Sequence, residues 1–414
     1  MTATSTAKVV QRKETKPIET VHAECCVVGG GPAGLILSLL LARKGVRVAL
    51  LESHKDFDRD FRGDTIHPST LEALDTLGLA DKLLELPHSK METIGFKSPN
   101  GTFKAADLRR LNTKFPFIAL MPQARFLEFI AKEAAKYPTF QLLMGANVTD
   151  MIQENGTAVG VRFQTSHGQG EVRAGLTVAC DGRASRMRKL AGFETIASSP
   201  PMDVLWFRLP AKKSDPKDEI FRLSGGHMLI VLDRGDEWQL GYVIVKGDYP
   251  KLKNEGIEAL RRSIVVLAPE FADRVQLLDD WKHITPLSVE SNRLPVWHKP
   301  GLLFIGDAAH AMSPVGGVGI NIAIQDAIVT SNMLWRDIHE GTAQEADLAK
   351  VQKAREYAVK RIQRLQTAIQ DRIVKTSLDP NATLKVPFFL RLPFIRDIPA
   401  RWIAFGVSHA LPDP

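Results

Sequence analysis

Three glycines stand at positions 29, 31 and 34, in the spacing Gly-x-Gly-x-x-Gly. Gly29 permits a tight turn, Gly31 lets the backbone approach a diphosphate, and Gly34 lets a helix pack closely on a strand. Pro32 and Ala33 complete the loop at the start of the helix. The N–H groups at a helix start attract anions. The pattern predicts a site for the diphosphate of a dinucleotide.

The segments around these glycines predict a strand at 24–28, a helix at 35–44 and a strand at 47–51. Both strands are apolar without alternation, as in a parallel sheet covered on its two faces. Glu52 ends the second strand, where a carboxylate accepts hydrogen bonds from a ribose 2′-hydroxyl and repels a 2′-phosphate. The adenosine therefore belongs to FAD or NAD. The alternative is a glycine-rich turn in an ordinary βαβ unit.

A second stretch able to do chemistry begins at Asp307, after an apolar strand at 302–306. Asp307 can accept hydrogen bonds from a chain of sugar-like hydroxyls. The glycine-rich run 314–321 lets backbone lie against a flat ring. A helix from about 319 to 338 would aim its positive end at that ring, a field that stabilises an anionic reduced flavin. The alternative is a glycine-rich loop that holds a surface helix.

A third motif, Asp181-Gly182-Arg183, follows a strand at 176–179. Asp181 and Arg183 could face a diphosphate, and we interpret them as functional. Arg188 and Lys189 fit a solvated face of a basic helix better.

In chain order the three motifs are Gly29–Gly34, Asp181-Gly182 and Gly306-Asp307, and together they resemble the p-hydroxybenzoate hydroxylase family, the single-component group A flavoprotein monooxygenases, over residues 22–345. The resemblance implies an α/β + β fold: a split Rossmann-like FAD-binding domain, an inserted β-sheet substrate domain and a C-terminal helical segment. It also implies FAD, NADH or NADPH as a transient reductant, and O2 as co-substrate. An apolar or aromatic substrate would be hydroxylated through a C4a-hydroperoxyflavin.

The resemblance also carries roles to single residues. Glu52 and Arg62 would contact the ribose and phosphates of FAD, Gln123 or Arg125 would also touch FAD, and Val148 would meet the adenine. Asp307 would hold the ribityl chain. Catalysis would involve Pro314 near flavin C4a, and the ring would rest on the backbone of Gly317, Val318, Gly319, Ile320 and Asn321.

We expect a disordered leader at 1–20. The FAD-binding domain would comprise 21–90, 116–192 and 286–345, the substrate domain 91–115 and 193–285, and the helical segment 346–414. Turn signals at Asn100-Gly101 and Asn155-Gly156 predict hairpins. Ser69 to Glu72 has the pattern of a capping box. Strands at 203–209, 227–232 and 238–245 carry apolar residues on both faces, so their sheet should be covered on both sides.

The substrate is harder to derive. In the resembled family a serine and an arginine on a strand of the insert hold a carboxylate, whereas residues 230–234 here are apolar up to their turn. This departure favours an apolar or aromatic ligand over a small benzoate. Arg208, His227 and Tyr242 are polar groups on predicted strands of the insert. Each could orient a hydroxyl or act as a base, or else be a surface or core residue.

The composition of the chain argues against several other classes of protein. The 414 residues carry a net charge of +7, spread without a dominant basic block, so we expect no nucleic-acid partner. The chain has no apolar run of membrane-spanning length and no signal-like start. Cys25, Cys26 and Cys180 lack a metal-ligand spacing and predict buried packing and a reducing cytoplasm. We expect the protein to be a monomer or a homodimer.

The C-terminal segment mixes aromatic and cationic residues, which lie at 388, 389, 391, 394, 396, 401, 402 and 405. Such a mixture can lie peripherally on a membrane. We favour the alternative that it packs on the FAD-binding domain.

Three other functions fit parts of the pattern. A flavin-dependent halogenase would resemble W-x-W-x-I-P, whereas residues 238–243 lack the second Trp and the Pro. An O2-independent flavin reductase of the prenyl reductase type would use the same reduced flavin. A non-catalytic flavin-binding regulatory protein would show no turnover.

Overall fold

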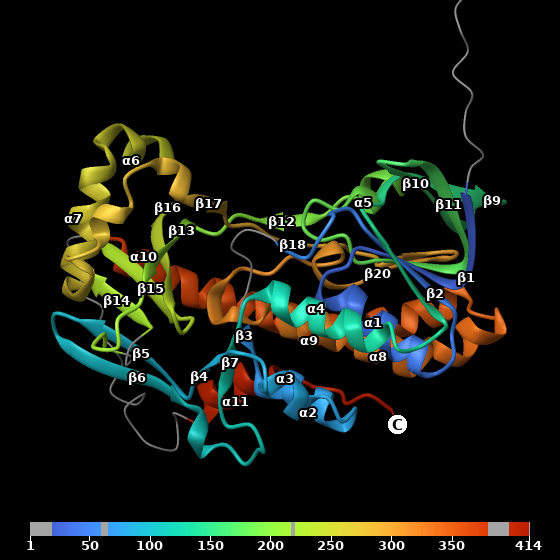
Figure 1. Cartoon of the computed structure of the whole chain (residues 1–414), viewed down its shortest axis with the longest axis horizontal. Helices are drawn as coiled ribbons and strands as arrows, with labels where there is room; N and C mark the ends of the chain where they lie inside the picture. Colours follow the sequence, from blue (N-terminus) through green and yellow to red (C-terminus); the bar gives the residue numbers. More distant parts are fainter. Residues whose placement is uncertain (1–18, 59–64, 217–219, 380–396, 414) are drawn as a thin grey trace, which may run out of the picture.

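The computed structural model describes residues 19–58, 65–216, 220–379 and 397–413. Most of the expected leader, Arg62 and the aromatic and cationic positions from 388 to 396 lie outside the described residues. Two main sheets occupy opposite ends of the molecule and are joined by long connections (Figure 1).

The first main sheet is built from two distant stretches of chain. Its strands lie in the order β19 (His298–Lys299), β20 (Leu302–Phe304), β11 (Gly168–Ala179), β1 (Glu19–Val28), β2 (Val48–Glu52) and β8 (Phe140–Met144). The neighbours from β20 to β8 are parallel. The antiparallel strands β9 (Asn147–Glu154) and β10 (Thr157–Thr165) extend the sheet from β11.

Four helices pack on this sheet or on one another beside it. They are α1 (Pro32–Arg43), α4 (Gln123–Ala134), α8 (Gly319–Glu340) and α9 (Glu345–Ile369). Helix α1 contacts α4 and α8, and α8 also contacts α9. Helix α1 starts three residues before the predicted start at 35, because Pro32 occupies its first turn, where a missing N–H has no cost.

The second main sheet combines strands from 93–107 and 202–288. Its order is β17 (Thr285–Ser288), β13 (Met202–Pro210), β16 (Glu237–Val245), β15 (His227–Asp233), β14 (Phe221–Ser224), β5 (Thr93–Ser98) and β6 (Gly101–Asp107). Leu229 and Val231 pack with α7 (Ile257–Leu267) on one face, while Met228 packs with Trp206 on the other. The prediction that both faces are covered is confirmed, although α7 and α6 (Tyr249–Glu255) were not anticipated.

Short elements connect the two main sheets. They are a sheet of β3 (Thr65–Ile66), β7 (Ile118–Leu120) and β4 (Ser89–Met91), the strand pair β12 (Ile196–Ser198) and β18 (Ser291–Arg293), and the helices α2 (Pro68–Thr76), α3 (Ala80–Leu84) and α5 (Arg186–Leu190). The predicted capping box is wrong. Helix α2 begins at Pro68 after His67, so Ser69 lies inside the helix and is buried.

Both predicted hairpins are confirmed. Residues 99 and 100 join β5 to β6, with Ser98 opposite Gly101. Asn155 and Gly156 join β9 to β10, and both have positive φ, as a type I′ turn requires.

The described part of the C-terminal segment packs on the protein. After α9, a π-helical turn (Gln370–Val374) and α10 (Lys375–Ser377) continue the helix, and α11 (Asp397–Phe405) returns to contact β6 and α2. Ala400 and Ala404 of α11 are fully buried. The segment is packed, as the favoured alternative expects, but α11 contacts mainly β6 of the predicted substrate domain and only partly α2 of the predicted FAD-binding domain. A peripheral membrane contact finds no support. No described helix is long and apolar enough to cross a bilayer.

Candidate active site

The glycine loop between β1 and α1 is closely packed at Gly29 and Gly34 and open at Gly31. A Cβ on Gly34 would overlap the carbonyl oxygen of Gly29, and one on Gly29 would lie 2.5 Å from the carbonyl oxygen of Cys180. At Gly31, by contrast, an added Cβ would meet no described atom within 4 Å. No described side chain caps the start of α1, so its first N–H groups remain available to an anion.

Glu52 connects the end of β2 to this loop. Its Oε2 accepts a hydrogen bond of 2.8 Å from the backbone N–H of Gly30. Its Oε1 accepts from the N–H of His54 at 2.9 Å and contacts the His54 ring at 2.6 Å. The buried carboxylate therefore lies next to the open space at Gly31, where an adenosine ribose is expected.

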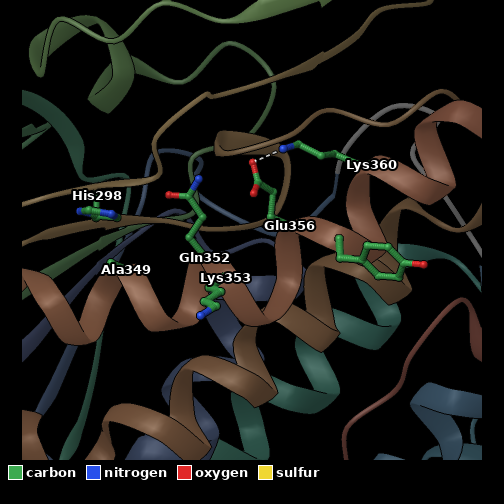
Figure 2. Close-up of a pocket in the computed structure, with 7 residues that line it drawn as sticks. His298, Ala349, Gln352, Lys353, Glu356 and Lys360 are labelled. Atoms are coloured by element: carbon green, nitrogen blue, oxygen red, sulfur yellow. Dashed lines mark ion pairs between the residues drawn. The ribbon is translucent and has the colours of Figure 1, made fainter.

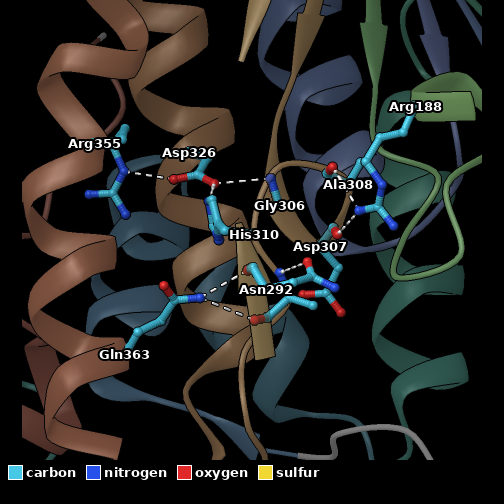
Figure 3. Close-up of polar contacts among 10 residues, drawn as sticks. Arg188, Asn292, Gly306, Asp307, Ala308, His310, Asp326, Arg355 and Gln363 are labelled. Atoms are coloured by element: carbon cyan, nitrogen blue, oxygen red, sulfur yellow. Dashed lines mark hydrogen bonds and ion pairs between the residues drawn. The ribbon is translucent and has the colours of Figure 1, made fainter. Parts of the chain in front are cut away.

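Asp307 lies directly after β20, within the short helical turn Gly306–Ala308. Its Oδ2 accepts a hydrogen bond of 3.2 Å from Nε of Arg183. The guanidinium of Arg188 donates to the backbone carbonyls of Asp307 and Ala308 at 3.1 and 2.9 Å (Figure 3). We expected Arg188 on a solvated helix face, but it is buried and holds this turn in place.

Asp181 organises its own turn. Its two oxygens accept hydrogen bonds from the Ser185 hydroxyl at 2.5 Å and the Met187 N–H at 2.9 Å. Burial raises the pKa of this carboxyl, and these bonds oppose the rise. Both oxygens thus have partners within the chain, which leaves Arg183 as the member of this motif that contacts Asp307.

A buried ionic cluster behind the turn of Asp307 was not found by sequence reasoning. Asp326 of α8 accepts hydrogen bonds from the Gly306 N–H at 3.0 Å, His310 Nε2 at 2.7 Å and Arg355 Nε at 2.8 Å (Figure 3). Burial alone would raise the pKa of Asp326, but His310 and Arg355 hold it below the usual range. The cluster fixes the strand end that carries Asp307. Its members are distant in sequence, and no spacing reveals them.

The loop that precedes α8 is held from two sides. The Thr65 hydroxyl donates to the Gly317 carbonyl at 2.9 Å, and a Cβ on Gly316 would lie 3.4 Å from the Trp402 ring. Gly316 and Gly317 both have positive φ, which explains the glycines. As at α1, no described side chain caps the start of α8. Its first N–H groups are thus available to an electron-rich ring edge.

Asn321 ties the first turn of α8 to the connection between β3 and α2. Its Oδ1 accepts from the His67 N–H at 3.0 Å and the Thr70 hydroxyl at 2.7 Å. The His67 ring in turn contacts the Ile403 carbonyl at 2.7 Å through Nδ1. Burial lowers the pKa of His67 to about 4, although carbonyl contacts oppose the shift. Three distant segments therefore meet at one neutral histidine.

The remaining cofactor candidates lie on or near the first main sheet. Gln123 and Arg125 occupy the first turn of α4, and the Arg125 guanidinium donates to the Pro87 carbonyl. Val148 is buried in β9 as part of the main core. No contact among the described residues assigns these three side chains to FAD, so their roles stay predictions.

The polar substrate candidates do not meet at one site. Tyr242 is buried on the α7 face of the second main sheet, where its hydroxyl lies 2.6 Å from Nδ1 of His227. By strand alternation Arg208 lies on the opposite face with Trp206, but it is half-exposed and ion-paired with Glu237 at 3.3 Å. Val315 packs against the cluster that contains Trp206, whereas Tyr242 belongs to the cluster on the α7 side.

A surface hollow of about 430 Å³ lies beside the N-terminal half of α9 (Figure 2). Its lining includes His298, Gln352 and the ion pair between Lys360 and Glu356, whose atoms are 2.6 Å apart. None of the site residues named above lines it. Among the described residues no group of three or more His, Cys, Asp or Glu side chains could hold a metal ion.

Comparison with known proteins agrees with this geometry. Residues 22–366 match the family described as FAD binding domain. A 6-methylpretetramide 4-monooxygenase of Streptomyces rimosus is 33% identical over 399 residues, which cover 94% of each chain. Other curated relatives are also named monooxygenases, and the chain spans 61% and 59% of the length of two of them.

Solved structures share the fold. p-Nitrophenol 4-monooxygenase PnpA from Pseudomonas putida DLL-E4 matches with a TM-score of 0.74 and 21% identity, over 93% of this chain and 94% of that one. The flavin-dependent brominase Bmp2 matches with a TM-score of 0.76 and 16% identity, over 94% and 95%.

The fold and the site define an FAD-dependent oxidoreductase. The chain belongs to the FAD binding domain family, and within it to the group A flavoprotein monooxygenases that resemble p-hydroxybenzoate hydroxylase. It is a monooxygenase with FAD as cofactor; a nicotinamide reductant and O2 are typical of the family. Membership of this group excludes a non-catalytic flavin-binding regulatory protein and disfavours an O2-independent flavin reductase.

Proposed function

We propose that this protein uses NADH or NADPH and O2 to hydroxylate an aromatic, largely apolar substrate. The observation that carries the proposal is one apolar cluster. In it Val315, the residue after Pro314, packs against a cluster that contains Trp206 and Met228 of the second main sheet. The residue next to the flavin-facing position and the substrate sheet thus share one water-poor surface.

The residues of this cluster suit a flat apolar ligand. Trp206 lies across Gly241, where an added Cβ would be 2.8 Å from its ring. Phe96 and Phe221 stack with ring centroids 4.8 Å apart. Aromatic side chains bind flat rings through stacked and edge contacts. The names of the relatives, which include a 6-methylpretetramide and a pentachlorophenol 4-monooxygenase, also suggest an aromatic substrate.

Bound FAD would supply the redox chemistry, in which a hydride from the nicotinamide and O2 give one oxygen atom to the substrate and one to water. The loop of Gly29 to Gly34 would hold the diphosphate, Glu52 the ribose and Asp307 the ribityl chain. The uncapped start of α8 would stabilise negative charge on the ring. The apolar cluster of Val315 would exclude water.

We further propose that segments 21–90, 116–192 and 286–345 bind FAD. Segments 91–115 and 193–285 would then provide the substrate face. Polar recognition would come from the Trp206 side of the sheet, since Tyr242 and His227 lie behind it.

The test is a screen of phenols and polycyclic aromatics with the FAD-loaded protein. A true substrate should accelerate NADH or NADPH oxidation, consume O2 and gain one oxygen atom from ¹⁸O2, seen as a mass increase. Reductant oxidation with a reduced product and no O2 uptake would instead identify the prenyl-reductase type. A halogenated product that requires halide would identify a halogenase. Either outcome overturns the proposal.

A further inference from the structure

A row of three glutamines runs along one side of α9 and its π-helical continuation. Gln363, Gln366 and Gln370 follow the spacing i, i+3, i+7, which places them on one helix face. All three are at least nine-tenths buried. Buried glutamine is uncommon and costly unless its amide is hydrogen-bonded. We call these residues the glutamine row.

Each member of the glutamine row donates its side-chain amide to the chain that leads to Pro314. Gln363 Nε2 donates to the carbonyls of Asn292 and Ala311, at 3.0 and 3.3 Å (Figure 3). Gln366 Nε2 donates to the carbonyls of Ser313 and Val315, both at 2.8 Å. Gln370 Nε2 donates to the Ser313 hydroxyl.

Gln366 is the centre of this arrangement. The two carbonyls that it joins stand on either side of Pro314, so a single amide group closes the loop around that residue. Its Oε1 is buried and has no hydrogen-bond partner among the described residues. The amide therefore keeps its orientation through its donor side, at the cost of an unsatisfied acceptor.

The helix that carries the row also reaches the substrate face. The π-helical turn begins at Gln370, and its last residue, Val374, is buried in the same apolar cluster as Val315 and Trp206. Single π-helical turns occur frequently at functional sites. One helix thus contacts the loop around Pro314 and contributes Val374 to the apolar cluster of the second main sheet.

We propose that Gln366, supported by Gln363 and Gln370, is a positioning residue for the oxygenation reaction. By fixing the carbonyls on both sides of Pro314, it holds the loop in the form that directs oxygen to the substrate rather than to peroxide. This inference rests on the proposed monooxygenase function. Gln366 itself touches neither the diphosphate loop of Gly29 to Gly34 nor Asp307.

A matched control exists on the same helix. Gln352 also clamps a backbone segment with its amide: Oε1 accepts from the Trp297 N–H and Nε2 donates to the Pro295 carbonyl, both at 2.9 Å. This residue lines the surface hollow of Figure 2, and Pro314 is not among the residues that line it. Gln352→Met and Gln366→Met therefore remove the same kind of bonds at two places.

We expect both variants to retain FAD, while their coupling differs. In Gln366→Met the ratio of hydroxylated product to hydrogen peroxide should fall about tenfold, the effect of losing roughly one net hydrogen bond. The KM for the nicotinamide should stay unchanged. Gln352→Met should keep the wild-type ratio. Gln366→Glu can donate only when protonated, so its ratio, normalised to wild type, should improve at lower pH, a gain absent from Gln366→Met.

Two readouts do not depend on turnover. Amide hydrogen exchange of residues 311–317 in the apoprotein should be faster in Gln366→Met than in wild type and Gln352→Met. The reduction potential of bound FAD should fall in Gln366→Met alone, because the loop leads to the start of α8. If wild type oxidises no substrate, the proposed function fails, but these measurements still decide the role of Gln366.

The proposal is overturned if Gln366→Met and Gln352→Met have the same amide hydrogen exchange, the same reduction potential of FAD and the same ratio of product to peroxide. Should Gln366→Met lose FAD, Gln370→Met carries the same comparisons, because it removes only the bond to the Ser313 hydroxyl. A Gln370→Met variant with wild-type loop exchange would then count against the glutamine row.

Discussion

His67 should make the protein acid-sensitive through a single proton. Its ring is fully buried, Nδ1 contacts the Ile403 carbonyl, and the ring also faces the Gly317 carbonyl. Burial lowers its pKa from 6.5 to about 4, so the folded state keeps the neutral form. The substitution His67→Gln removes this titration while keeping a side chain able to donate to Ile403.

The magnitude follows from linkage. Between pH 6.5 and 4 the unfolded chain binds a proton at this position that the folded chain does not, so stability falls as the pH falls. The contribution is complete above pH 6.5 and constant again below pH 4. A shift from 6.5 to about 4 corresponds to about 3 kcal/mol across this window. Wild type should lose that much more stability than His67→Gln.

The assay is urea unfolding of the full chain, followed by tryptophan fluorescence at steps between pH 4 and 7.5. His167, an exposed residue in the β10–β11 turn, supplies the control His167→Gln. The difference in unfolding free energy between wild type and His67→Gln should change with pH, whereas that for His167→Gln should stay nearly flat. Parallel pH curves for wild type and His67→Gln would refute the reasoning.

Asp307→Ala should weaken FAD retention by about ten- to a hundredfold, the range for a lost charged hydrogen bond, and a variant still yellow after gel filtration would contradict the ribityl contact. Gly31→Ala should keep the apoprotein's thermal stability but bind FAD poorly in fluorescence titration, since its methyl fills open space. Gly34→Ala should fail to fold, because its methyl overlaps the Gly29 carbonyl; soluble yellow protein would disprove this. Asp326→Asn should lower the unfolding free energy by about 3–5 kcal/mol in thermal or urea melts, because Arg355 stays buried without its counter-charge; a change under about 1 kcal/mol would contradict it.

The sequence predicts those parts of the fold that local chemistry dictates. The loop of Gly29 to Gly34 and the turn at Asn155-Gly156 depend on glycine conformations, and both were found where expected. Pairing between distant segments is not local. Strand β1 begins at Glu19 rather than at 24 because its first residues pair with β11 from Gly170 onward, which no property of residues 19–23 reveals.

The side chains that support the site could not be predicted from the sequence for a related reason. Gln366 and Arg355 lie on a helix whose polar residues suggest a solvated surface, yet both are buried. They are buried because they bind groups from other segments: Gln366 binds the loop around Pro314, and Arg355 binds Asp326. The pattern from Ser69 to Glu72 predicted a helix start that the structure does not have, because the helix already begins at Pro68.

The meeting of Thr65, His67 and Ile403 with the start of α8 has a consequence for biosynthesis. The Thr65–Gly317 and His67–Ile403 contacts join residues 252 and 336 positions apart. A ribosome must therefore release the chain as far as residue 403 before His67 acquires its carbonyl partner. Nascent chains halted near residue 350 would carry the diphosphate loop without the His67–Ile403 contact, so stable loading of the flavin should follow the release of residue 403.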